Sequence, residues 1–189
     1  MLSSLRMAMV SMAYALLELE VREHGGENRG EVVDMIIEKQ HFTPGPAAPW
    51  CAGLWATIYE LACELCHNVP VFNPGMSTSR NVKLAETAGL LVDEPRRGDA
   101  ACFKGDDYNT GYKHTGLVFT LPNANGDYTT IEGNAGNAIK LMNRNLHLHP
   151  ATFISCEGGG EPLQDFRWLK ELVLNHSGQL GELQKHIGG

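Results

Sequence analysis

Apolar residues recur at helical spacing in four segments of the first half of the chain, which cover residues 9–19, 29–39, 51–66 and 77–89. This spacing places the apolar side chains of each segment on one face and therefore predicts four amphipathic helices. Asn28 is a candidate N-cap for the second helix, because its side-chain oxygen can accept a backbone N–H. The third segment is the most strongly periodic, and Cys51 is its first residue.

The second half of the chain contains short β-prone runs between turns rich in Gly, Asn and Asp. The runs cover residues 100–103, 115–121, 128–132 and 146–155. Asn125-Gly126-Asp127 separates two of them and is a typical hairpin turn. Helices that precede an antiparallel sheet predict an α+β fold, with the N-terminal helices packed on the sheet.

The end of the chain returns to helical spacing. Residues 163–187 predict a C-terminal helix that packs on the domain or contacts a partner. A chain of 189 residues is in the size range of one ordinary domain. We therefore expect one domain over residues 1–160 and a helical extension over residues 161–189.

The charge of the chain argues against one large class of partner. Its formal net charge is -7, its pI is about 5.6, and Arg96-Arg97 is its one basic pair. Proteins that bind a phosphate backbone present clustered Lys and Arg, so we expect no nucleic-acid partner. No run of apolar residues approaches the roughly 18 that are needed to cross a bilayer, so we also expect no membrane span.

The cysteines indicate where the chain is made. Five cysteines at irregular spacing cannot form a complete disulfide framework. This pattern favours synthesis in a reducing cytoplasm, where disulfides are rare. The apolar stretch 7–17 is not followed by an A-x-A cleavage site, so we do not interpret it as a signal peptide.

Cys51 is the one cysteine that opens a predicted helix. Unpaired N–H groups and the helix dipole favour a thiolate at that position, and the thiolate is the nucleophilic form of cysteine. The same N–H groups can stabilise the oxyanion that forms when a thiolate attacks a carbonyl. The alternative is a small buried cysteine beside Trp50, so the hypothesis of a nucleophile needs partner residues.

His114, Glu132 and Asn134 are the candidate partners. His114 opens a strand-like run, where its imidazole can meet the start of the Cys51 helix if that helix packs on the sheet. Glu132 and Asn134 end the next run, two residues apart, and would share one face of an extended strand. Either of them can hold the imidazole by its other nitrogen and set its tautomer.

These residues lie in short motifs whose order and spacing resemble one family. The motifs are Pro49-Trp50-Cys51-Ala52, Gly98-Asp99, His114-Thr115-Gly116-Leu117-Val118 and Ile131-Glu132-Gly133-Asn134, with Asn28-Arg29-Gly30 upstream. Together, over about residues 12–153, they resemble the catalytic CHAP domain, the cysteine, histidine-dependent amidohydrolase/peptidase family, as found in bacteriophage cell-wall hydrolases. The resemblance implies a papain-like fold in which Cys51 is the nucleophile and His114 is its base. It also implies that Glu132 is the orienting third member and that Asn134 is a supporting polar group.

Two patterns typical of metal or haem binding have another interpretation. Cys63-Glu64-Leu65-Cys66-His67 matches the spacing of c-type haem attachment, but it continues an amphipathic helix whose apolar face is needed for packing. The same residues lack a fourth zinc ligand at ordinary spacing, unless His147 or His149 supplies it. We therefore expect no metal ion and no cofactor.

The function that the resemblance implies is hydrolysis of an amide bond in bacterial peptidoglycan through a Cys51 thioester. The enzyme would act on the cell wall after release or as a virion component. It would be either an N-acetylmuramoyl-L-alanine amidase or an endopeptidase, and the sequence does not choose between them. Two other classes remain open: a non-catalytic virion structural or binding module of the same fold, and a cysteine protease or toxin that acts on proteins.

Overall fold

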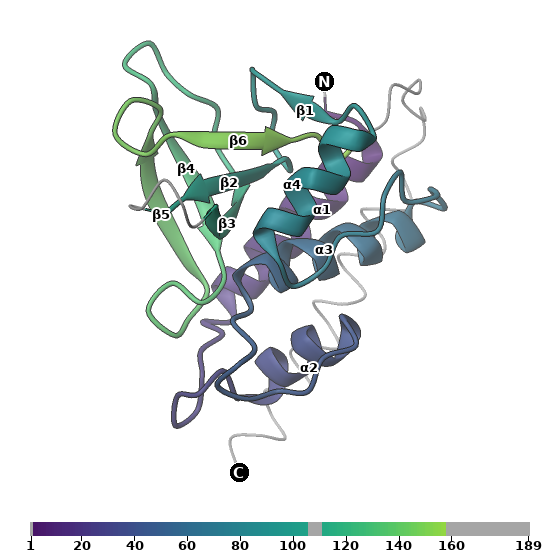
Figure 1. Cartoon of the computed structure of the whole chain (residues 1–189), viewed down its shortest axis with the longest axis vertical. Coiled ribbons are helices and arrows are strands. Elements are labelled where there is room, and N and C mark those ends of the chain that lie inside the picture. The colour runs from purple at the N-terminus through teal and green to yellow at the C-terminus, as the bar shows by residue number, and fades with distance from the viewer. Residues whose placement is uncertain (1, 106–110, 158–189) are drawn as a thin grey trace.

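The computed structural model describes residues 2–105 and 111–157 of the chain. Within them, four helices precede the sheet (Figure 1), namely α1 (Ser4–Glu18), α2 (Glu31–Lys39), α3 (Cys51–Leu65) and α4 (Thr78–Thr87). The four helices expected from the apolar spacing are therefore confirmed. None of the helices in these two ranges is both long and apolar enough to cross a membrane. The expected C-terminal helix at 163–187, with the extension that contains it, lies outside the described residues.

The sheet is antiparallel throughout. Its strands are β1 (Leu91–Val92), β2 (Ala100–Lys104), β3 (Tyr112–Val118), β4 (Asp127–Glu132), β5 (Lys140–Asn145) and β6 (Ala151–Ile154). Their spatial order is β1-β6-β2-β3-β4-β5, and every neighbouring pair runs antiparallel. Figure 1 shows α1, α3 and α4 gathered on one side of the sheet, with α2 below α3 in this view. Helices grouped beside an antiparallel sheet define an α+β fold, so that expectation is confirmed.

The start of α2 differs from the prediction. Asn28 is not its N-cap, because the helix begins at Glu31, after Gly30. Asn28 has a φ of 56° and lies in a left-handed turn instead. The N–H of Gly30 donates to the carboxylate of Asp34, which caps the first turn from inside the helix. The side chain of Asn28 is consequently available for contacts with distant loops.

Two strands, β1 and β5, have no counterpart in the sequence prediction. β5 is an edge strand of largely polar residues with no buried position, so it lacks the apolar alternation by which strands are recognised. The run expected at 146–155 contributes only β6. Its first residues turn instead, because the Asn145 side-chain oxygen accepts the backbone N–H of His147 at 2.9 Å.

Helix α3 lies at the centre of the main core. Most of its side chains are buried, and Trp55 and Ile58 are each only 1% exposed. Each large apolar side chain buried in this way contributes about 1.5–3 kcal/mol to stability. The helix packs against α1, α2 and β3. This packing brings the first residue of α3 to the strand that carries His114.

Alternate residues of the sheet form a second, smaller apolar cluster, which consists of Ala101, Phe103, Val118, Tyr128 and Phe153. Neighbouring residues such as Ala100, Cys102 and Leu117 belong to the main core instead. Successive side chains of a strand point to opposite faces, so the two clusters lie on opposite faces of the sheet. The register pairs Phe103 with His114, which places His114 on the face of the smaller cluster.

A buried ion pair ties α1 to the start of β2. Arg6 Nη1 donates to Asp99 Oδ1 at 2.7 Å, and the two side chains are 4% and 1% exposed. The same guanidinium donates to Ser155 and to Glu157 beyond β6. The other oxygen of Asp99 accepts the backbone N–H of Arg96 at 2.7 Å. The charge of Arg6 is therefore satisfied inside the fold, and the first turn of α1 is fixed relative to the sheet.

Candidate active site

Cys51 is the first residue of α3, and the residue before it is firmly held. The indole N–H of Trp50 donates to Glu23 Oε1 at 2.9 Å, and Trp50 is fully buried. Its ring packs against Gly133, directly after β4, where a Cβ would lie only 2.7 Å from a ring carbon. These contacts bring the N-terminus of α3 against the strand end that carries Glu132.

The surroundings of Cys51 favour its thiolate. Burial by itself raises the pKa of this thiol. The hydrogen bond and charge of His114, with the backbone N–H groups of Thr115 and Ala52, outweigh burial and hold the pKa below its usual value. Cys51 Sγ lies 4.0 Å from the carbonyl oxygen of Lys113, so the sulfur faces the backbone of β3 beside His114. The N–H groups at the start of the helix and the neighbouring imidazole therefore both lower the pKa of Cys51.

His114 connects Cys51 to Glu132. Its Nε2 lies 2.7 Å from Glu132 Oε2, which leaves Nδ1 for the thiol. The His114 side chain is 26% exposed and the Glu132 side chain is 0% exposed. Burial lowers the pKa of His114, but its hydrogen bonds with Cys51 and Glu132 overcome this and raise the pKa to about 9. The three side chains form a row in the order Cys51, His114 and Glu132, in which the His114 imidazolium stabilises the thiolate form of Cys51.

Two further residues hold the buried carboxylate of Glu132. Arg144 donates through Nε to Oε1 at 2.7 Å and through Nη2 to Oε2 at 2.5 Å. Thr130 donates its hydroxyl to Oε1 at 2.5 Å. Burial raises the pKa of Glu132, but the bonds from His114, Arg144 and Thr130 lower it to about 2. Glu132 is consequently ionised at neutral pH, so it is suited to orienting His114 and stabilising its positive charge.

Gly116 provides the space that this carboxylate occupies. It is paired with Glu132 in the register of β3 and β4. A Cβ at Gly116 would lie 2.8 Å from Glu132 Cγ and 2.9 Å from Thr130 Cβ, which is closer than such atoms pack. The Glu132 side chain therefore crosses β3 at this glycine on its way to His114.

Asn134 makes its contact elsewhere. Strand β4 ends at Glu132, and Asn134 lies in the following turn with a φ of 55°, so the two do not share one face of an extended strand as expected. Asn134 Nδ2 donates to Asn28 Oδ1 at 3.0 Å. Asn28 Nδ2 in turn donates to the carbonyl oxygen of Gly45 at 3.2 Å and to that of Pro46 at 3.1 Å. Asn134 thus joins the turn after Glu132 to the loop that leads to the nucleophile.

The sequence patterns did not identify Thr130, Gly116 or Arg144 as site residues. Thr130 carried a signal, because it precedes Glu132 by two residues and so shares its strand face. Gly116 carried one as well, since a glycine inside a strand often marks a close approach. No sequence pattern indicated Arg144. It lies opposite Tyr128 in the register, and the residue opposite Glu132 is Lys140.

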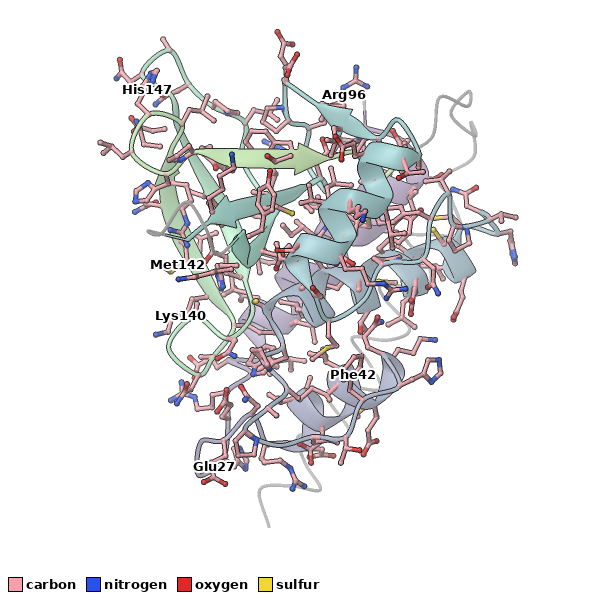
Figure 2. The ribbon with its side chains drawn as sticks, in the orientation of Figure 1. Glu27, Phe42, Arg96, Lys140, Met142 and His147 are labelled. Carbon is pink, nitrogen blue, oxygen red and sulfur yellow. The ribbon has the colours of Figure 1, made fainter. Side chains whose placement is uncertain are left out.

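The candidate zinc ligands do not come together among the described residues. In residues 2–105 and 111–157, no three His, Cys, Asp or Glu side chains are arranged to hold a metal ion. Cys63 and Cys66 are buried, and burial raises the pKa of Cys63 to about 11. His147 lies in the turn after β5, and Figure 2 shows it at an end of the sheet away from α3. All five cysteines are free thiols.

Three of the four predicted site residues thus form one connected group. Cys51, His114 and Glu132 are linked in that order, and Asn134 is attached to the surrounding loops through Asn28. The arrangement is a polarised thiol at a helix N-terminus, beside an imidazole that a buried carboxylate orients. No protein-family model matches this chain, and no curated protein matches it either.

Proposed function

We propose that the chain is a cysteine amidohydrolase or peptidase that hydrolyses an amide bond of bacterial peptidoglycan. One observation carries the proposal: the Cys51 thiol, at the start of α3, is linked through His114 to the buried carboxylate of Glu132. Nucleophilic catalysis by cysteine uses this order of groups, because a base must activate the thiol and a third group must orient the base.

In the first half of the reaction, the Cys51 thiolate attacks the carbonyl carbon of the amide and an S–C bond forms. The first turn of α3 supplies N–H groups without helical acceptors, which suit the oxyanion. The His114 imidazolium gives its proton to the amide nitrogen, the C–N bond breaks, and the amine leaves. Glu132 stays ionised, because its pKa of about 2 is far below neutral pH.

In the second half, the neutral His114 takes a proton from a water molecule as the water oxygen attacks the thioester carbon. The S–C bond then breaks and the carboxylic acid product leaves. This step restores the thiolate of Cys51 and the imidazolium of His114 together, so the site is ready for another substrate.

The choice of peptidoglycan rests on the motif resemblance to the CHAP domain. The papain-like part of that resemblance is supported by α3, which begins with Cys51 and packs on the strand that carries His114. A net charge of -7 means that an anionic wall would be bound through local contacts and not by long-range attraction. The scissile bond is either the amide between the sugar lactyl group and the stem peptide, or a peptide bond of the stem or cross-bridge.

Incubation of the purified protein with cell walls and, separately, with casein tests this proposal. We expect the turbidity of the walls to fall and new amino groups to appear, with the Cys51→Ala variant inactive. A mass spectrum of the fragments then separates the two cleavages, because an intact stem peptide with a free N-terminus marks the amidase. Cleaved casein beside intact walls would favour a protease. Wall binding without released amines would favour a non-catalytic module.

A further inference from the structure

We infer that Arg144 is a positioning residue of this site, which holds the carboxylate of Glu132 against His114 and thereby stabilises the reactive thiolate form of Cys51. The inference rests on the cysteine chemistry proposed above. Arg144 reaches along β4 from its register partner Tyr128 and binds both oxygens of Glu132. A bidentate arginine–carboxylate pair fixes geometry as well as charge.

The charges of the site compensate one another only when Arg144 is included. When Cys51 is in its thiolate form, the negative charges of Cys51 and Glu132 balance the positive charges of His114 and Arg144, so the charges of the row sum to zero. Glu132 is 0% exposed and Arg144 is 16% exposed, so water screens this row only weakly. Arginine carries a permanent charge in proteins, whereas the proton of His114 moves during catalysis. Arg144 is therefore the permanent counter-charge of Glu132.

Loss of that counter-charge should change the ionisation of Glu132, and through Glu132 and His114 that of the Cys51 thiol. Burial is the largest influence on Glu132 and favours its neutral form. Without Arg144, we expect Glu132 to hold a proton more readily and to stabilise the His114 imidazolium less well. His114 would then be protonated less of the time and would stabilise the Cys51 thiolate less. The hydrogen bond and charge of His114 are the main influences that lower the pKa of this thiol.

Phe103 holds the two cationic groups in place. The Arg144 Cζ lies over the Phe103 ring, 4.4 Å from its centroid. The His114 ring stacks on the same side chain, with centroids 6.2 Å apart and planes inclined by 27°. Phe103 is 7% exposed and belongs to the smaller apolar cluster, so its own position is set by packing. A guanidinium stacked on a fixed ring reaches its carboxylate already oriented.

The other titratable groups around the row do not replace Arg144. Lys140 lies opposite Glu132 in the register, but it is exposed on the edge strand β5, at the outer side of the sheet in Figure 2, and makes no ion pair with Glu132. Lys104, at the end of β2, lies over the Tyr112 ring at 5.7 Å. Lys113, beside His114 on β3, extends over Gly105. On β4, burial raises the pKa of Tyr128 to about 12, so this hydroxyl is neutral.

The test measures how fast iodoacetamide alkylates Cys51 across the pH range, by peptide mapping of wild type, Arg144→Gln, Arg144→Lys and Lys140→Gln. At about pH 6 we expect Arg144→Gln to react roughly tenfold more slowly or worse, because each pKa unit gained by the thiol cuts its thiolate fraction about tenfold. Arg144→Lys should slow the reaction less, since it keeps the charge and loses the bidentate geometry. Lys140→Gln is the matched control and should react like wild type.

A folded Arg144→Gln variant with the wild-type pH–rate curve would overturn the inference. If that variant does not fold, Arg144→Lys decides: a curve shifted to higher pH supports the positioning role, and an unshifted curve overturns it. Alkylation reports the ionisation of Cys51 and needs no substrate. Fast alkylation at low pH without wall hydrolysis would therefore refute only the proposed substrate. Ordinary thiol reactivity of Cys51 in the wild type would overturn both proposals.

Discussion

Glu132 lies directly opposite Gly116 in the pairing of β3 and β4, and its side chain passes over the glycine to end 2.7 Å from His114 Nε2. A glycine inside a strand ordinarily costs roughly 0.5–1 kcal/mol relative to alanine. Here the missing side chain is what allows a fully buried carboxylate to meet the imidazole. The catalytic geometry therefore requires glycine at position 116, whereas the stability of the strand would favour a residue with a side chain.

Gly116→Ala should damage activity more than stability. The added methyl would lie 2.8 Å from Glu132 Cγ, so the carboxylate must move away from His114. We expect at least a tenfold loss of hydrolysis, because misplacing a catalytic group by about 1 Å can cost about a hundredfold. Activity assays with thermal unfolding check this. Gly105→Ala is the matched control, since its methyl would meet only the flexible end of Lys113. Equal activity of the two variants would contradict the spacer role of Gly116.

Cys51→Ala should abolish hydrolysis and leave the fold intact, because it removes the nucleophile and trims one small side chain. His114→Ala should cost about as much, since residues that act as a unit have strongly non-additive effects. The double variant should be no worse than either single one. Rates of amine release and circular dichroism check these statements, with Cys63→Ala as a control for the loss of a buried thiol on the same helix. Near-wild-type lysis by folded Cys51→Ala would refute the mechanism.

Cys51 should be the first cysteine to react with iodoacetamide at mildly acidic pH. Its pKa is held below the usual value, whereas burial raises the pKa of Cys63 to about 11 and that of Cys102 to about 12. Burial also raises the pKa of Cys66 and of Cys156. The thiolate is the reactive form, so the difference should exceed tenfold in rate. Peptide mapping after brief labelling checks the order, and earlier labelling of Cys102 or Cys156 would be the contrary result.

The hydrolysis rate should follow a bell-shaped pH profile. Its alkaline limb should lie near pH 9, where His114 loses the proton that the leaving amine needs. Its acid limb should lie below the usual pKa range of a thiol, where the thiolate takes up a proton. Both limbs belong to the Cys51–His114 pair and not to one residue. The ratio kcat/KM on soluble wall fragments, measured across the pH range, checks this, and an alkaline limb near the ordinary histidine value would count against a charged pair.

Glu132→Gln should leave a slow but active enzyme. The amide oxygen can still accept one hydrogen bond, but the charge that stabilises the imidazolium is lost and Arg144 faces an NH2 group. We expect a rate loss between about tenfold and about 10⁴-fold, and a loss of roughly 1–3 kcal/mol in the free energy of unfolding. Asn134→Ala should be milder, because its amide is bonded to Asn28. Kinetics of both variants decide the matter: greater damage from Asn134→Ala would assign the orienting role to Asn134.

The local pattern of the sequence determined the helices, the hairpin turn and the start of α3. Helical spacing, turn chemistry and helix boundaries are properties of a few neighbouring residues, so Cys51 could be recognised as the first residue of a helix before any tertiary contact was known. The same reasoning did not find β5, because an exposed edge strand needs no apolar alternation.

Only the tertiary structure decided how the polar groups are paired. Glu132 is bound by Arg144, although the residue opposite Glu132 in the register is Lys140. Arg6 is buried in an ion pair with Asp99, which lies far from it in the sequence. Side chains as long as arginine reach several residues along a strand or into another layer, and burial makes a charge depend on whichever counter-charge it meets there. Those encounters join residues far apart in the sequence, so they follow from the packing of helices on the sheet and not from any local spacing.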